Sequence, residues 1–127
     1  MMQQLQFEAA WEKTLAPQDL EYIKGIFQKT KDLTSSRILF SPIREAINHK
    51  GELLVTVLVH NFSDLLVKFT NTRLLYKIQG DIKAEKAFTL PTLVIPPQVS
   101  MPWTFIFPKD SYTPSSSFEN GQLEIFK

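Results

Sequence analysis

Two histidines are the first residues to consider for chemistry, because an imidazole can act as a general base or a metal ligand near neutral pH. His49 falls in a predicted turn, and His60 ends a predicted strand. Neither has a second histidine at the spacing that places two ligands on one helix face. Each is therefore predicted to be an ordinary surface histidine.

Other reactive groups give no stronger signal. The residues of a Ser-His-Asp triad come together only in the folded protein, so the sequence alone does not exclude one. However, no Gly-x-Ser-x-Gly motif occurs, and Pro102 follows Ser100 too closely for a strand-to-helix elbow. The chain has no cysteine and only 4 glycines, which excludes thiolate sites and disfavours a glycine-rich phosphate loop. We predict no catalytic residue, no metal site and no cofactor, and hence no enzyme.

Acidic residues are also poorly placed for catalysis. A carboxylate pair that acts as acid and base must be held together in a partly dry pocket. Asp81 and Glu85 instead alternate with Lys83 and Lys86. Alternating charge of this kind protects the exposed edge of a sheet from pairing with other chains. The segment is predicted to be a solvated edge.

The aromatic stretch over residues 100–108 is the most distinctive part of the chain. Trp103, Phe105 and Phe107 share one face of a predicted strand, which favours a core position. The alternative is an exposed aromatic patch that binds a partner, with Trp103 as its anchor. The residues predicted as possible partner contacts are Trp103, Phe105, Trp11 and Arg44.

Composition limits the class of protein. The chain has 127 residues, 43% of them hydrophobic, which suits one domain with a buried core. The net charge of +1 argues against nucleic acid or an anionic membrane as partner. No apolar run approaches the roughly 20 residues that span a bilayer. The first residues lack the pattern of a signal peptide, so a cytoplasmic location is expected.

The elements that would position these residues begin with a helical arm. Phe7, Ala10 and Trp11 show helical spacing, and Pro17 suits the first position of a second helix. This second helix is expected to end before the loop-like cluster at residues 34–36.

From Arg37 onward, apolar residues alternate with a period of two. The clearest strand covers residues 52–60, with one apolar face and one mixed face that the helical arm could cover. A turn precedes it at residues 48–51, and Pro42 marks the edge or interruption of the strand before. Segment 67–78 switches its apolar face near residue 71, which indicates a bulge. Segment 82–90 is expected to close at Pro91.

About six or seven short strands without helices between them indicate a sandwich or barrel. We predict a mainly β fold: an antiparallel, immunoglobulin-like β-sandwich preceded by one or two α-helices. A single domain over residues 1–127 would comprise a helical arm (1–34) and the sandwich (35–127).

Several blocks in order along the chain resemble the SLAP domain of Bacillus-type bacteria. They are residues 42–46, 48–54, 88–91, 95–97 and 100–108, together with Trp11 and the helix start at 17–19. That family takes its name from proteins linked to S-layer assembly and an accessory Sec secretion system. Some members carry two copies of the domain, and this chain has room for one. The resemblance implies a β-rich module and brings no catalytic residue.

Three functions remain open at this point. The first is a protein-interaction module that assists secretion or assembly of cell-surface proteins, offering a sheet edge or an aromatic patch to an extended client. The second is a ligand-binding or hydrolytic domain with Tyr76, Tyr112, His60 and Arg73 as polar candidates. The third is a structural homodimer in which the helical arm is swapped or packed between copies.

Overall fold

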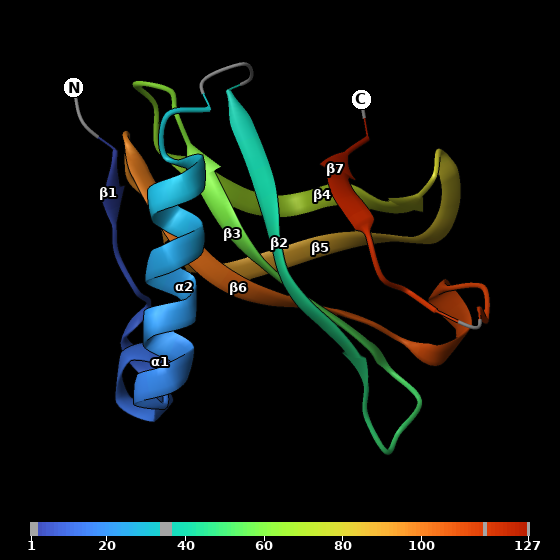
Figure 1. Cartoon of the computed structure of the whole chain (residues 1–127). Coiled ribbons are helices and arrows are strands. Elements are labelled where there is room, and N and C mark those ends of the chain that lie inside the picture. Colours follow the sequence, from blue (N-terminus) through green and yellow to red (C-terminus); the bar gives the residue numbers. More distant parts are fainter. Residues whose placement is uncertain (1–2, 34–36, 116, 127) are drawn as a thin grey trace.

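The computed structural model describes residues 3–33, 37–115 and 117–126, and the predicted loop at 34–36 lies outside them (Figure 1). Within that part the chain forms two α-helices, a 3-10 turn at Lys109–Ser111 and seven strands. The helices are α1 (Ala9–Thr14) and α2 (Pro17–Thr30). The strands are β1 (Gln4–Leu5), β2 (Ile38–Ile47), β3 (Leu53–Asn61), β4 (Val67–Ile78), β5 (Asp81–Ile95), β6 (Val99–Phe107) and β7 (Gly121–Ile125).

The helical arm follows the sequence pattern. Pro17 occupies the start of α2, where its missing N–H leaves no hydrogen bond unmade. Ile23 and Phe27 are buried on one side of α2, as their spacing of four requires. None of the helices in the described ranges is long and apolar enough to cross a membrane.

The strands form two sheets. Sheet A has the order β1-β6-β3-β2, and sheet B has the order β5-β4-β7. Among the named strands of the described residues, every pairing is antiparallel except that of β1 with β6, which is parallel. The prediction of a mainly β fold with two packed layers is confirmed, but sheet A is mixed and not purely antiparallel. The parallel strand is β1, which precedes α1 and pairs with β6. Two residues are too few to show the alternation that predicts a strand.

Strand β3 separates two apolar clusters. Its odd-numbered residues, among them Leu53 and Val57, face sheet B in the main core. Leu58 points the other way and joins Ile23, Phe27 and Ile43 beneath the arm. Figure 1 shows α2 lying across this outer face of sheet A. The prediction that the arm covers part of the second face of this strand is confirmed at Leu58.

Turns and irregularities show where the sequence was informative and where it misled. The predicted bulge in β4 is present, since the register shifts between Phe69 and Thr72 and Asn71 has a positive φ of 48°. The prediction that Pro91 closes a strand was wrong, because β5 continues to Ile95. Strand β5 lies at the edge of sheet B, and the register jumps there, so that Phe69 pairs with Leu90 and Lys68 with Val94. A proline is tolerated at such an edge because no neighbour needs its N–H.

Candidate functional site

The aromatic stretch that was singled out from sequence lies in β6. Phe105 is 1% exposed and makes edge-on ring contacts with Phe40 and Phe88. Phe107 is fully buried, and Trp103 is partly buried against the same core. Phe105 and Phe107 are therefore core residues, as the first of the two interpretations expects. Phe105 is not accessible to a partner. The side chain of Trp103 remains partly exposed to solvent.

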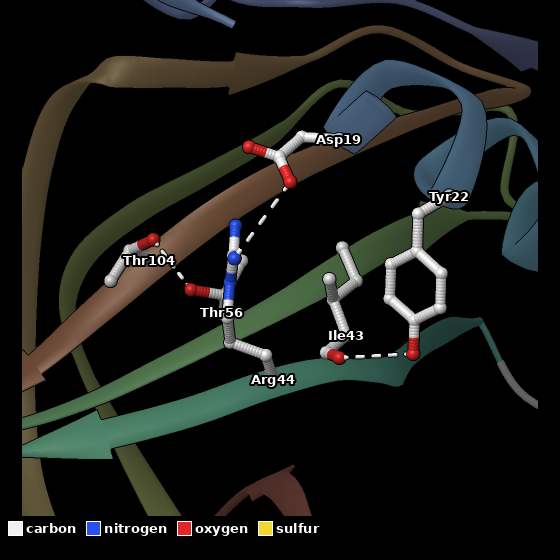
Figure 2. Close-up of polar contacts among 6 residues, drawn as sticks. All are labelled: Asp19, Tyr22, Ile43, Arg44, Thr56 and Thr104. Carbon is white, nitrogen blue, oxygen red and sulfur yellow. Dashed lines mark hydrogen bonds and ion pairs between the residues drawn. The ribbon is translucent and has the colours of Figure 1, made fainter. Parts of the chain in front are cut away.

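Trp11 and Arg44 both belong to the join between arm and sheet. Trp11 is partly buried against the cluster beneath the arm. The Arg44 guanidinium lies 3.9 Å from the Asp19 carboxylate of α2, and the Tyr22 hydroxyl donates to the Ile43 carbonyl at 3.4 Å (Figure 2). Both contacts are long and partly exposed, so each contributes little to stability. They mark where α2 meets the bulge in β2.

Arg44 also begins a polar row across the outer face of sheet A. Register places it beside Thr56 of β3 and Thr104 of β6, whose hydroxyls are 2.8 Å apart (Figure 2). The next row holds Ala46, the partly buried Leu54 and the exposed Ile106. This uncovered end of the sheet face is a candidate contact surface.

The prediction that His60 is a surface histidine was wrong. His60 is 0% exposed and stacks on Phe62, with its Nδ1 2.6 Å from Ser100 Oγ and its Nε2 3.0 Å from Ser41 Oγ. Gln3 Nε2 also donates to Ser100 Oγ, at 3.1 Å. The Ser100 proton can then be donated to Nδ1, which places the ring proton on Nε2, directed at Ser41. Even-numbered positions of β3 face the arm, so His60 is covered from that side.

A serine 2.6 Å from an imidazole resembles a nucleophile with its base. Here His60 and Ser100 are both 0% exposed, so no substrate can reach them. Burial also lowers the pKa of His60 from 6.5 to about 4, which keeps the ring neutral. Nowhere in the described ranges do three or more His, Asp or Glu side chains gather as a metal site would require. The network is a structural feature.

The remaining polar candidates of the ligand-binding hypothesis are dispersed. The Tyr76 hydroxyl donates to the Phe118 carbonyl at 2.6 Å, and the Tyr112 hydroxyl donates to the Gly51 carbonyl at 2.7 Å. Arg73 pairs with Glu85 at 2.8 Å. A cavity lies between the two sheets, and none of these side chains lines it.

That cavity is a groove of about 600 Å³ between the two sheets. We define it by its lining residues: Arg37 and residues 38–40 of β2, Leu66, 67–68 and Thr72 on the β4 side, and 122–125 of β7. Strand β2 is one of the two outer strands of sheet A, and β7 is one of the two outer strands of sheet B. In Figure 1 β2 begins, and β7 ends, on the same side of the molecule. The groove is thus bordered by the outer strands of two different sheets.

The backbone on both borders points into the groove. Phe62 N donates to Arg37 O, which makes that couple a hydrogen-bonded pair of the β2–β3 ladder. Alternation along an antiparallel ladder then directs the N–H and C=O of Phe40 away from β3. On the other side, Phe126 N donates to Arg73 O, so the backbone groups of Leu123 point away from β4.

One side chain joins these two edges. Gln122 Nε2 donates to Phe40 O at 2.7 Å and to Leu123 O at 3.2 Å. The amide of Gln122 thus supplies to each edge the donor that the peptide group of an added strand would supply. Gln122 itself is one of the residues that line the groove.

Sequence reasoning missed the groove residues. The one signal near the groove was Pro42, which was expected to mark either an interruption or an edge of its strand, and β2 does lie at an edge of sheet A. Which strand of sheet B would face that edge depends on the sheet order, and residue patterns do not encode the order.

Comparison with known proteins adds a family. A family model described as SLAP domain matches residues 5–125. No curated protein and no solved structure matches the chain, so the likeness to immunoglobulin domains stays a prediction. Because the match spans nearly all of the fold described above, the chain belongs to the SLAP domain family.

Proposed function

We propose that this chain is a non-catalytic protein-interaction module that binds an extended segment of a client protein in the groove between β2 and β7. The observation that carries the proposal is the pair of outer strands, one from each sheet, that face each other across the groove and are joined by the Gln122 amide. Four residues of each edge line the groove, a length of about 13 Å at the rise of a strand. Addition of a strand at an edge depends on main-chain hydrogen bonds and needs no special side chain.

The family suggests which clients to consider. The SLAP domain takes its name from S-layer assembly and accessory Sec secretion, and this supports a role in secretion or assembly of cell-surface proteins. A protein that awaits export is still extended, which is the form that a sheet edge can pair with. We therefore place the interaction in the cytoplasm, before the client is exported.

A small-molecule ligand is the second candidate, because the groove volume of about 600 Å³ lies in the usual range for ligand pockets. Against it, Tyr76, Tyr112, His60 and Arg73 bond to local partners elsewhere. A homodimer through the arm has lost its first motivation, since Trp11, Ile23 and Phe27 pack on their own sheet.

The absence of cysteine gives a clean test by site-directed cross-linking. Lys68→Cys places one thiol in the groove, Arg44→Cys places one on the outer face of sheet A, and Lys29→Cys places one on the exposed side of α2. Each thiol is labelled with a photoactivatable group, and the protein is mixed with an unfolded precursor of a secreted surface protein. We expect cross-links from position 68 and none from position 29. Cross-links from position 44 alone would move the site to the outer face and reject the groove.

A further inference from the structure

We propose that β6 carries a self-association edge, at which two copies of this chain pair antiparallel over residues 103–107 about a two-fold axis at Phe105. This surface is separate from the groove, because β6 and β2 lie toward opposite sides of sheet A in the order β1-β6-β3-β2. Sheet A of one copy would continue into sheet A of the other, and the groove of each copy would stay open.

The backbone of β6 shows which of its groups point outward. Gln6 N donates to Ser100 O at 3.0 Å, so Ser100 directs its backbone groups toward β1 and away from β3. The register between β6 and β3 runs along the whole strand without a shift. By alternation, the N–H and C=O groups of Thr104 and Ile106 also point away from β3.

These outward groups have no partner within the described ranges. Strand β1 pairs with β6 only at Val99 and Ser100, beside the beginning of β6 (Figure 1). Thr104 bonds to Thr56 through its hydroxyl, and no hydrogen bond between described residues uses the outward backbone groups of Thr104 or Ile106. These two residues therefore offer their backbone donors and acceptors to an added strand.

This part of the edge also lacks the charges that usually protect one. None of residues 99–107 is charged, whereas the outer strand β5 of sheet B carries Asp81, Lys83, Glu85 and Lys86. Charged side chains on an edge discourage pairing with other chains. Because a copy of a neutral strand brings no like charge opposite itself, β6 is suited to pair with β6 of a second molecule.

Two prolines favour a second copy over a foreign strand. Pro102 and Pro108 are equidistant from Phe105 in the chain, so the two-fold axis places Pro102 of one copy opposite Pro108 of the other. Neither proline has an N–H to offer, and Pro108 O already accepts from Ser111 N at 2.9 Å. The pairing therefore ends at both prolines without an unmatched donor. A foreign strand that continued past Pro102 would carry a carbonyl that meets no donor.

The side chains that would meet are apolar and partly uncovered. Ile106 is 45% exposed, and Trp103 is partly exposed at the margin of the core. In this register Ile106 lies opposite Thr104 of the second copy, and Trp103 lies opposite its Phe107. Cross-strand pairs of aromatic and β-branched residues are favourable. The dimer would thus cover the part of Trp103 that the monomer leaves exposed.

Sedimentation equilibrium of the full chain measures the association. Concentrations from about 10 µM to about 1 mM are needed, because an interface this small predicts a dissociation constant on the order of 100 µM. Ile106→Lys brings two ammonium groups into diagonal positions across the axis, and it should weaken the dimer at least about tenfold at low salt. Ile82→Lys is the matched control on β5, at a residue that is 51% exposed, and it should leave the dimer unchanged.

A charge-swapped pair of variants tests the register. Thr104→Glu alone should associate poorly, because its two carboxylates repel each other across the axis. Mixed with Ile106→Lys, it places a carboxylate opposite an ammonium group, and the mixture should associate at least about fivefold more tightly than either variant alone. Thr56→Val removes the hydroxyl partner of Thr104 without adding a charge, and it should leave the dimer unchanged. Circular dichroism verifies folding, and Ile106→Glu replaces Thr104→Glu if the latter does not fold.

Three outcomes would overturn the proposal. The first is a chain that stays monomeric over the whole concentration range. The second is a dimer that Ile82→Lys weakens as much as Ile106→Lys does, or a mixture of charge-swapped variants that associates no better than its components. The third is a monomeric chain whose β6 edge binds an extended peptide, which would make a foreign strand the occupant. The cross-linking at position 68 tests the groove independently of all three.

Discussion

His60 shows at the scale of one residue how a buried polar group constrains the fold. Its ring nitrogens lie 2.6 Å from Ser100 Oγ and 3.0 Å from Ser41 Oγ, and these serines lie on β6 and β2. The histidine therefore links three strands of sheet A. Such a network is stable only while every member is paired and neutral. Protonation of the ring would bring a charge into a site with no described carboxylate among its hydrogen-bond partners.

Stability is therefore expected to depend on pH through His60. Its pKa is about 4 in the folded chain against an ordinary 6.5, so between these values the unfolded chain binds the extra proton. The contribution is fully present above pH 6.5, and it is lost as the pH falls toward 4. The free energy of unfolding should fall by up to about 1.4 kcal/mol per pH unit in this window.

Urea unfolding at several pH values measures this dependence. The change His60→Gln should remove most of the slope between pH 6.5 and 5, where carboxylates contribute little. The change His49→Gln is the matched control, because His49 is exposed in a turn, and it should leave the slope as it is. An unchanged slope in His60→Gln would show that the ring does not titrate as described.

Replacement by alanine is expected to have opposite effects on stability at two glycines, Gly121 and Gly25. A Cβ at Gly121 would overlap the Tyr76 ring, whose hydroxyl is held by the Phe118 carbonyl. Gly121→Ala should lower the free energy of unfolding by about 1–3 kcal/mol through overpacking. A Cβ at Gly25 meets nothing within 4 Å on the exposed side of α2. Gly25→Ala should raise the same free energy by up to about 1 kcal/mol.

Thermal or urea unfolding of both variants checks the pair. Because both changes add the same methyl group, differences between them reflect position alone. Equal effects of the two changes would contradict the packing described around Tyr76.

At the scale of elements, the sequence revealed what depends on local alternation. The strand predicted over 52–60 was correct in position and in the roles of its two faces, because Leu53, Val55 and Val57 repeat at a period of two. The turn at 48–51 was also readable, since Gly51 adopts a φ of 79° and the Asn48 side chain accepts from the backbone of Lys50.

What the sequence could not reveal depends on which elements become neighbours. Pro91 suggested the end of a strand, but at the edge position of β5 the strand continues through it. His60 looked exposed because its hydrogen-bond partners come from other strands, Ser41 at 19 and Ser100 at 40 positions away in the chain. The groove between β2 and β7 joins residues 82 positions apart at the bond from Gln122 to Phe40. No short-range pattern contains such information.

The attachment of α2 to sheet A gives a prediction about this element. Ile23 is 1% exposed between α2 and Leu58, so Ile23→Ala should cost about 2–5 kcal/mol in the stability of the helix. Ile82→Ala is the matched control at a residue that is 51% exposed, and it should change stability by less than about 0.5 kcal/mol. Far-ultraviolet circular dichroism during urea unfolding follows the helix. Equal costs at the two positions would mean that α2 is not packed as described.

At the scale of the whole molecule, we expect the cluster beneath the arm to need the folded sheets, whereas the main core between the sheets does not need the arm. The main core fills the space between the sheets, whereas the cluster beneath the arm consists of Ile23, Phe27, Ile43 and Leu58 on the outer face of sheet A. The sheets can keep their core when the arm is detached. The arm cannot stay packed when sheet A unfolds, because its partner surface belongs to that sheet.

Native-state hydrogen exchange can detect this asymmetry, since local opening and global unfolding expose different amides. In Ile23→Ala the amides of α2 should lose protection, while those of β4 and β5 keep theirs. Phe69→Leu instead opens space in the main core, where Phe69 is 2% exposed and its ring lies 5.6 Å from that of Phe105. This change should reduce protection in both sheets and in α2 together. If Ile23→Ala lowers protection uniformly, arm and sandwich unfold as one unit, and the groove would then lose its edges whenever the arm detaches.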